Sequence, residues 1–298
     1  MKNILLTILL LIISGISFGQ VKAVIIDSNT KEKIPYVNIW VDNENIGTTS
    51  NENGEFTLDF NGDSQTILFS AIGYETRKIE FGLINDVVEL KSKNIELQEV
   101  IIKPTKQKKE LKIGEFKKSS VNFYFGCGTK PWIAARYFKF KESYSQTPFL
   151  NTIKLLTNSD VKDSKFNIRF YSVDKNGEPC NFIYDKNILV NVRKGKKVTD
   201  VDISELKIEF PKEGFFIAIE WLIIESNKYE YTYTMNNSKK KLSGISYEPS
   251  IGTVPSKSNA NSWIYSKGRW EKVWKNTEQI KSYKDKYNLL AIELLLTN

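Results

Sequence analysis

The chain has 298 residues, carries 43 lysine and arginine against 35 aspartate and glutamate residues, and contains no histidine. Without histidine it cannot form a Ser-His-Asp or Cys-His catalytic arrangement, nor a zinc site built on imidazole ligands. Residues 20–102 hold 7 basic and 14 acidic residues, so the net charge of +8 arises in the later part of the chain.

That positive charge has two interpretations. Lysine on strand faces and edges keeps sheets from pairing edge to edge, and this is the commoner reason for such a pattern. The alternative is attraction to polyanions such as lipopolysaccharide or acidic glycans. Lysine outnumbers arginine and no nucleic-acid-binding motif accompanies it, so we expect no nucleic acid as partner.

Residues 1–19 have the pattern of a secretory signal peptide. Lys2 supplies the positive start, residues 4–13 form an apolar run, and Ser17-Phe18-Gly19 is a small-x-small cleavage site. Cleavage before Gln20 predicts an exported chain, located in the periplasm or at the outer membrane or cell surface. No later apolar stretch reaches about 18 residues, so we expect a soluble mature chain without a transmembrane segment.

Residues 20–102 have the strand and turn pattern of one small β-sandwich. Strands are expected at residues 21–27, 36–41, 78–81, 87–90 and 95–102. Three more short strands are expected within residues 46–74, separated by turns at Asn53-Gly54 and Gly62-Asp63. Phe56, Leu58 and Phe60 recur at every second residue, which predicts that one face of their strand is buried.

Four segments of this region carry a family resemblance: VIIDSNTKEKIPYVNIWV, IGTTSNENGEFTL, ILFSAIGYET and IELQEVII. In this order they resemble the carboxypeptidase-regulatory-like domain, a transthyretin-like sandwich of exported proteins in Bacteroidetes-type bacteria. The resemblance implies a seven-stranded sandwich that serves as an accessory module, often ahead of an outer-membrane receptor barrel. Such a barrel needs about 22 strands, which the remaining chain is too short to provide.

Residues 103–118 are rich in lysine and poor in apolar residues, which predicts an exposed basic linker. Residues 119–298 then show eight to ten strand patterns and few helix signals, so we expect a second, jelly-roll-like β-sandwich. This half loosely resembles galactose-binding-like jelly rolls, a likeness that rests on its strand pattern and on FPKEGFFIAIEWL. The apolar run 215–224 predicts a strand in the middle of a sheet that is covered on both sides.

Two cysteines, Cys127 and Cys180, lie in the second half. An oxidising compartment and an even count favour one disulfide between them, and two separate buried thiols are the alternative. No spacing of residues resembles a metal site, and we expect no cofactor. A carboxylate pair such as Glu220 and Glu293 would be needed for glycan hydrolysis, but one outward-pointing acid per strand explains these residues better. We therefore expect no enzyme activity.

The one candidate ligand site is an aromatic hairpin at residues 262–274. If Lys267-Gly268 forms a two-residue turn, Tyr265 pairs with Trp270 and Trp263 faces Lys272, with Trp274 further along the same side. The resulting platform could stack sugar rings, with Lys272 and Arg269 holding hydroxyls or acidic groups. The alternative is that these rings cover the core, and a one-residue shift of register would destroy the platform.

These observations favour a non-catalytic exported protein that acts as a binding, adhesion or scaffold module of the cell envelope. A carbohydrate-binding protein that uses the aromatic hairpin is the first alternative. An accessory partner of an outer-membrane transporter is the second. The ligands or partners expected are therefore glycans or envelope proteins.

Overall fold

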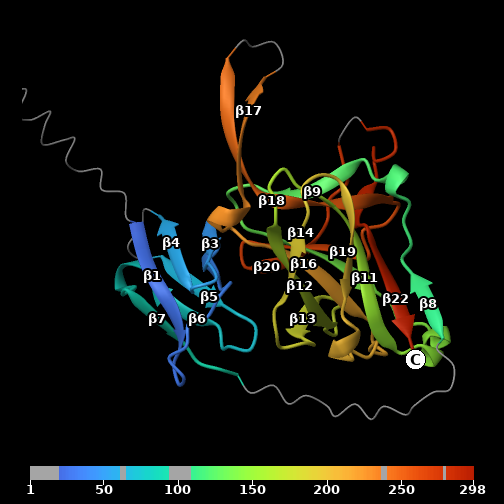
Figure 1. Cartoon of the computed structure of the whole chain (residues 1–298), viewed down its shortest axis with the longest axis horizontal. Coiled ribbons are helices and arrows are strands. Elements are labelled where there is room, and N and C mark those ends of the chain that lie inside the picture. The colour runs from blue at the N-terminus through green and yellow to red at the C-terminus, as the bar shows by residue number, and fades with distance from the viewer. Residues whose placement is uncertain (1–19, 61–64, 94–108, 236–239, 278–279) are drawn as a thin grey trace, which may run out of the picture.

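The computed structural model describes residues 20–60, 65–93, 109–235, 240–277 and 280–298, and its regular elements are almost entirely strands (Figure 1). The helices within these ranges are 3-10 helices of three to five residues. None of them is long and apolar enough to cross a membrane. The expected signal peptide at residues 1–19 lies outside the described residues.

The described residues of the first sandwich form seven strands in two sheets. One sheet has the order β4-β1-β7 and the other the order β3-β2-β5-β6. The strands are β1 (Gln20–Asp27), β2 (Asn38–Val41), β3 (Gly47–Thr49), β4 (Glu55–Asp59), β5 (Thr66–Ser70), β6 (Arg77–Glu80) and β7 (Val87–Leu90). The predicted seven-stranded sandwich is thus confirmed, while the strand expected at residues 95–102 lies outside the described residues.

Alternating burial builds the core of this sandwich, as the sequence predicts. Phe56 and Leu58 of β4 and Ile67 and Phe69 of β5 are buried, and the residues between them are not. Gly54 adopts a φ of +72° in the turn before β4, where a Cβ would lie 2.8 Å from the Ile25 carbonyl oxygen. Only glycine fits this turn without strain.

Asp27 closes the turn after β1 through its side chain. Its Oδ1 accepts hydrogen bonds from the backbone N–H groups of Thr30 (2.9 Å) and Asn29 (2.7 Å), and these bonds lower the pKa of the carboxyl. Because the folded pKa lies below the unfolded one, the ionised carboxylate stabilises the fold above its ordinary pKa of about 3.9. That stabilisation is lost as the pH falls through the folded pKa.

Acid unfolding of the Asp27→Asn variant tests this turn. The amide oxygen of asparagine can accept the same two hydrogen bonds but does not titrate, so we expect the stability of the variant to depend less on pH below about 4. Asp27→Ala, which cannot accept them, should be less stable than the wild type at neutral pH. Circular dichroism between pH 2 and 7 measures both effects, and identical acid transitions in wild type and Asp27→Asn would contradict the account.

The second sandwich consists of a seven-stranded and an eight-stranded sheet. The first contains β10 (Ile133–Phe138), β12 (Ser164–Val173), β13 (Pro179–Phe182), β14 (Ile188–Val192), β16 (Phe215–Trp221), β19 (Ser262–Ser266) and β20 (Arg269–Lys272). The second contains β8 (Glu110–Ile113), β9 (Phe123–Cys127), β11 (Phe149–Asn158), β15 (Lys197–Asp202), β17 (Lys228–Thr234), β18 (Lys241–Ser256), β21 (Tyr287–Leu290) and β22 (Ile292–Thr297). The predicted second β-sandwich is confirmed.

Strand β16 occupies the middle of the seven-stranded sheet, between β10 and β12, and all seven of its residues are buried. Phe215, Ile217 and Ile219 belong to the main core, whereas Phe216 and Ala218 join a second apolar cluster. This confirms the prediction of a central strand covered on both sides.

The predicted linker at residues 103–118 is wrong at its carboxyl end. Glu110–Ile113 forms β8, which pairs with β22 at the edge of the eight-stranded sheet. Leu111 and Ile113 pack against the main core, and burial of these two side chains outweighs repulsion among the surrounding lysines. The second sandwich therefore starts at β8 rather than at Ser119, and residues 103–108 lie outside the described part.

The predicted disulfide is also wrong, because both cysteines are free thiols. Cys127 ends β9 in the eight-stranded sheet, and Cys180 lies on β13 in the seven-stranded sheet. Cys127 is buried in the main core, where desolvation raises the pKa of its thiol to about 12. Cys180 is exposed.

Candidate ligand-binding cavity between the two sandwiches

On the outer face of strands β2 and β5, side chains point away from the core of the first sandwich. Ile39 and Val41 point into that core, so the alternating residues Asn38 and Trp40 point outward from β2. On β5, Leu68 alternates in the same way with the core residues on either side. This face lies against the second sandwich.

Three kinds of contact join the domains. The Ile223 N–H donates to the Thr49 hydroxyl at 3.1 Å, and the ring of Trp40 meets that of Tyr265 edge to face at a centroid distance of 5.6 Å. Tyr36 packs with the second sandwich in a small apolar cluster. At Gly47, a Cβ would lie 2.4 Å from the Ile39 carbonyl oxygen of the paired strand and 2.9 Å from Pro131 of the second sandwich, so the absence of a side chain permits both the strand pairing and the close approach of the two domains.

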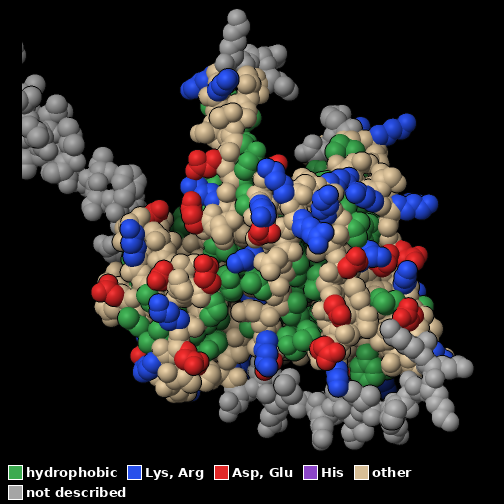
Figure 2. Space-filling view, viewed as in Figure 1, with side chains coloured by type: hydrophobic (Ala, Val, Ile, Leu, Met, Phe, Trp, Pro, Cys, Tyr) green, Lys and Arg blue, Asp and Glu red, His purple; other side chains and the backbone are tan. Residues whose placement is uncertain are grey.

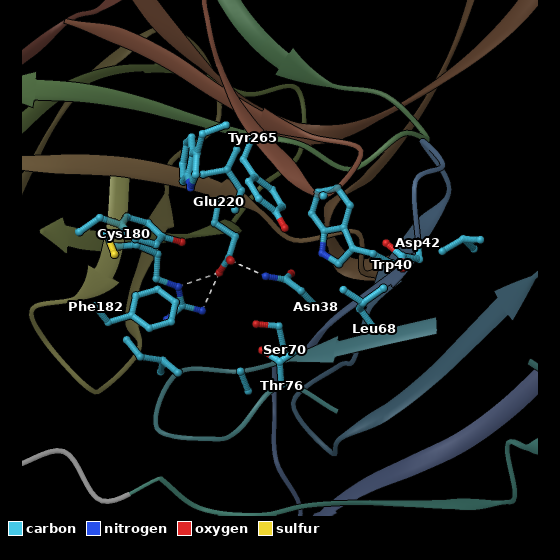
Figure 3. A pocket seen from close by; sticks show the side chains of 18 of the residues that line it. Asn38, Trp40, Asp42, Leu68, Ser70, Thr76, Cys180, Phe182, Glu220 and Tyr265 are labelled. Carbon is cyan, nitrogen blue, oxygen red and sulfur yellow. Dashed lines mark hydrogen bonds and ion pairs between the residues drawn. The ribbon is translucent and has the colours of Figure 1, made fainter. Parts of the chain in front are cut away.

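A cavity of about 210 Å³ remains between these contacts (Figure 3). The first sandwich contributes one wall through the outer face of β2 and β5. The second contributes the other through β12, β13, β16, β19 and β20. The lining residues include Asn38, Trp40, Asp42, Arg169, Tyr171, Cys180, Glu220, Tyr265 and Trp270.

A buried ion pair forms the polar end of the cavity. Glu220 Oε2 accepts from Arg169 Nη2 at 2.6 Å and from Nε at 2.9 Å, and both side chains are at least 96% buried. Asn167 Nδ2 donates to the same oxygen at 3.1 Å, and Asn187 Oδ1 accepts from Arg169 Nη1. Two asparagines thus satisfy groups of the pair that water would otherwise hydrate.

The second oxygen of this carboxylate links the two domains. Asn38 Nδ2 of the first sandwich donates a hydrogen bond to Glu220 Oε1, as Figure 3 shows. Glu220 therefore binds both Arg169 within its own sheet and Asn38 across the domain boundary. Ser70 lies opposite Asn38 on the paired strand β5, and Ser70 and Thr76 line the same cavity (Figure 3).

Aromatic rings form the other end of the cavity. The ring of Trp270 meets Tyr265 at 5.2 Å and Tyr171 at 5.3 Å, the latter edge to face. Burial, and then the carboxylate of Glu220, raise the pKa of Tyr171, while burial and then Asp42 raise that of Tyr265. Both phenols therefore stay neutral at physiological pH and can donate hydrogen bonds to a ligand.

The predicted register of the aromatic hairpin is confirmed. Tyr265 lies opposite Trp270, and Trp263 lies opposite Lys272. Both residues of the turn, Lys267 and Gly268, have positive φ, as a tight two-residue turn requires. Tyr265 and Trp270 therefore share the face of the hairpin that lines the cavity.

The other predicted site residues do not form an open platform. Trp263 is 4% exposed and packs edge to face on Phe216, so it covers the core as the alternative interpretation expects. Lys272 lies over the Trp263 ring at 5.2 Å, and Arg269 pairs with Glu271 at the exposed edge. Because β20 ends at Lys272, the alternation of side chains between the two faces of the hairpin does not continue to Trp274.

Trp274 lies beyond the end of β20, and it does not line the interdomain cavity. It borders a different cavity together with Ile264 and Ser266, whose side chains alternate with that of Tyr265. The prediction that four aromatic rings share one face is therefore wrong.

Glu220 and Glu293 do not converge as a catalytic pair. Glu220 lies on β16 of the seven-stranded sheet, and Glu293 lies on β22 of the eight-stranded sheet. Each is bound to a cation, Glu220 to Arg169 and Glu293 to Lys154 at 2.9 Å. Within the described residues, no group of three potential metal ligands is found either.

Sequence reasoning missed the ion pair and the contribution of the first sandwich. A signal was present, because Arg169 interrupts FNIRFYSV and Glu220 interrupts FFIAIEWL, two otherwise apolar strands. Charges of opposite sign in two such strands predict pairing if the strands are neighbours. Trp40 gave a similar indication. It alternates with the core residues of β2, so this large apolar ring points away from the first core and predicts a contact with another part of the chain.

A family model, that of the CarboxypepD_reg-like domain, matches residues 21–102. No curated protein shows significant similarity to the chain. Among solved structures, the cysteine protease and lectin-like domains of Cwp84, a surface layer associated protein of Clostridium difficile, show 14% identity and a TM-score of 0.35. That match covers 66% of this chain and 37% of the other.

Two further structures share low similarity. A clostridial Cwp84 cysteine protease after propeptide cleavage is 12% identical, with a TM-score of 0.37, over 81% of this chain and 53% of that one. The infectious bursal disease virus Gx strain is 8% identical, with a TM-score of 0.25, over 88% of this chain and 61% of that one. The family match and the seven observed strands agree, and residues 21–102 are therefore a CarboxypepD_reg-like domain.

Proposed function

We propose that the protein is a non-catalytic binding protein of the cell envelope that holds one sugar ring in the cavity between its two sandwiches. The observation that carries the proposal is the convergence of Trp40, Tyr265 and Trp270 with the Asn38–Glu220–Arg169 network in one cavity. Aromatic rings offer faces to the apolar side of a sugar, and fixed polar groups bind its hydroxyls.

The size and charge of the cavity favour a small neutral ligand. Its volume of about 210 Å³ is below the roughly 300–1,000 Å³ of pockets for drug-sized molecules, so a single ring fits better than a longer glycan. Arg169 and Glu220 neutralise each other, and Asp42 adds an acidic group. An anionic ligand would be repelled, and binding should depend little on salt.

The signal-peptide pattern of residues 1–19 supports an exported location, in the periplasm or at the outer surface. The CarboxypepD_reg-like domain fits the role of an accessory module that builds half of the cavity. Figure 2 shows basic and acidic side chains interspersed on the face in view, which favours solvated surface charge over one extended polyanion-binding patch.

Trp270→Ala should weaken binding of the sugar about tenfold, because the ring that stacks on the ligand is lost. A glycan-array screen of residues 20–298 at two salt concentrations identifies the ligand, and calorimetry then compares the variants. Trp274→Ala is the matched control, since it removes a tryptophan just beyond the same hairpin that borders a different cavity. Equal affinity in the wild type and Trp270→Ala would contradict the proposal.

A scaffold or adhesion role is the second candidate, and the β17–β18 hairpin favours it. This hairpin projects from the body of the molecule (Figure 1), and Tyr231, Tyr233 and Met235 on it are 39–58% exposed. Such a surface suits a protein partner in the envelope, including an outer-membrane transporter. Co-purification from envelope extracts that is lost in Tyr233→Ser would favour this role over sugar binding.

A further inference from the structure

A second cavity, of about 510 Å³, lies on the other side of the aromatic hairpin. Ile264 and Ser266 of β19 line it, and they alternate with Tyr265, which faces the interdomain cavity. Strand β9, the chain leading into β10 and the segment after β20 form most of the remaining walls, and Asn45 of the first sandwich and Asn288 of β21 also line the cavity. Its volume lies within the range of small-molecule sites.

An immobilised indole forms the apolar wall. The ring of Trp132 stacks on Trp221 at a centroid distance of 4.7 Å and meets Phe125 edge to face at 5.2 Å. Its Nε1 donates to the Gly126 carbonyl oxygen at 3.2 Å. This wall is therefore rigid before any ligand arrives, which lowers the entropic cost of binding.

Trp274 borders the same cavity and is 65% exposed. An indole left in water forgoes the stabilisation that its burial would give. Its exposure at the rim of an apolar cavity leaves a large flat surface available to stack on a ring-shaped ligand.

The polar groups of this cavity are basic or neutral. Lys130 and Lys275 line it, and neither forms an ion pair with a side chain that the structure describes. None of the described lining residues is acidic. Ser266 and Thr277 contribute neutral hydroxyl groups. The site thus offers two positive charges together with hydroxyl groups.

From these groups we infer a second binding site, for an acidic sugar. The ring stacks on Trp274, and the carboxylate lies between the ammonium groups of Lys130 and Lys275. Ser266 and Thr277 add hydroxyl groups to the lining, and these favour a sugar acid over an aromatic carboxylate, because the sugar brings several hydroxyls that can hydrogen bond to them. This ligand differs in charge from the neutral sugar proposed for the interdomain cavity.

Calorimetric titration of the full mature chain with an oligogalacturonate tests the inference, and a neutral oligogalactan serves as the comparison. We expect the acidic oligosaccharide to bind at least tenfold more tightly. Trp274→Ala should weaken that binding about tenfold, and Lys275→Gln about fivefold with a smaller dependence on salt. Thr277→Val tests a hydroxyl contact and should also weaken binding.

Two control variants separate this site from general charge attraction and from the other cavity. Lys212→Gln removes an exposed lysine on the loop before β16, and Trp270→Ala removes a ring of the interdomain cavity. Neither should change the affinity for oligogalacturonate. The inference is overturned if no binding occurs, if the neutral oligosaccharide binds equally well, or if Trp274→Ala leaves the affinity unchanged. Equal loss of binding in Lys212→Gln and Lys275→Gln would also overturn it.

Discussion

Replacing Glu220 with leucine should lower the free energy of unfolding by about 3–5 kcal/mol, because it leaves the buried charge of Arg169 without its partner. Arg169 is 2% exposed, and Glu220 Oε2 accepts two of its hydrogen bonds. Arg169→Met should be similarly destabilising, since it leaves the buried carboxylate of Glu220 without its cation. Urea unfolding monitored by tryptophan fluorescence measures both variants.

The double variant Arg169→Met/Glu220→Leu separates the ion pair from simple packing. Removing both charges avoids an unpaired buried ion, so the double variant should be more stable than either single variant. Glu293→Gln is the matched control, because its partner Lys154 is one third exposed and water can hydrate the ammonium group when the carboxylate is removed, so the loss should be smaller than for Glu220→Leu. Additive losses in the double variant would show that the two charges do not stabilise each other.

Trp40→Ala should uncouple the two sandwiches, with a loss of about 3–5 kcal/mol, because a buried indole is removed from their boundary. Trp40 is buried although it points away from the core of its own domain, and its ring contacts Tyr265 of the other. We expect the first sandwich of this variant to unfold at a lower temperature than the second. Differential scanning calorimetry would resolve two transitions where the wild type shows one.

Leu83→Ala is the control for this prediction. Leu83 belongs to the same domain but is 66% exposed, so its truncation should change stability by less than about 0.5 kcal/mol. A single transition with an unchanged midpoint in Trp40→Ala would mean that the observed boundary does not couple the domains.

The strands were predictable because their burial alternates along the sequence. The pattern at Phe56 and Leu58 fixed both the position and the orientation of β4. The turn residues Lys267-Gly268 fixed the register of the hairpin, and with it the pairing of Tyr265 with Trp270. Local periodicity and turn chemistry decide these features, and neither requires knowledge of distant contacts.

The cavity itself could not be predicted, because it depends on how distant strands meet. Asn38 and Glu220 are 182 residues apart, and nothing in either segment identifies the other as its partner. The position of Trp274 depended on where β20 ends, which alternation alone does not give. The failed disulfide has the same cause, since cysteine count says nothing about which sheet each thiol occupies.

Protection of Cys180 from alkylation tests the binding cavity most directly. Cys180 lines the cavity and is exposed, whereas Cys127 is buried with a raised pKa and serves as an unreactive internal reference. A neutral sugar selected on the array should slow alkylation of Cys180 by iodoacetamide in the wild type, and much less in Trp270→Ala at the same sugar concentration. A sugar that binds with full affinity but leaves the alkylation rate unchanged in both proteins would show that the ligand sits elsewhere.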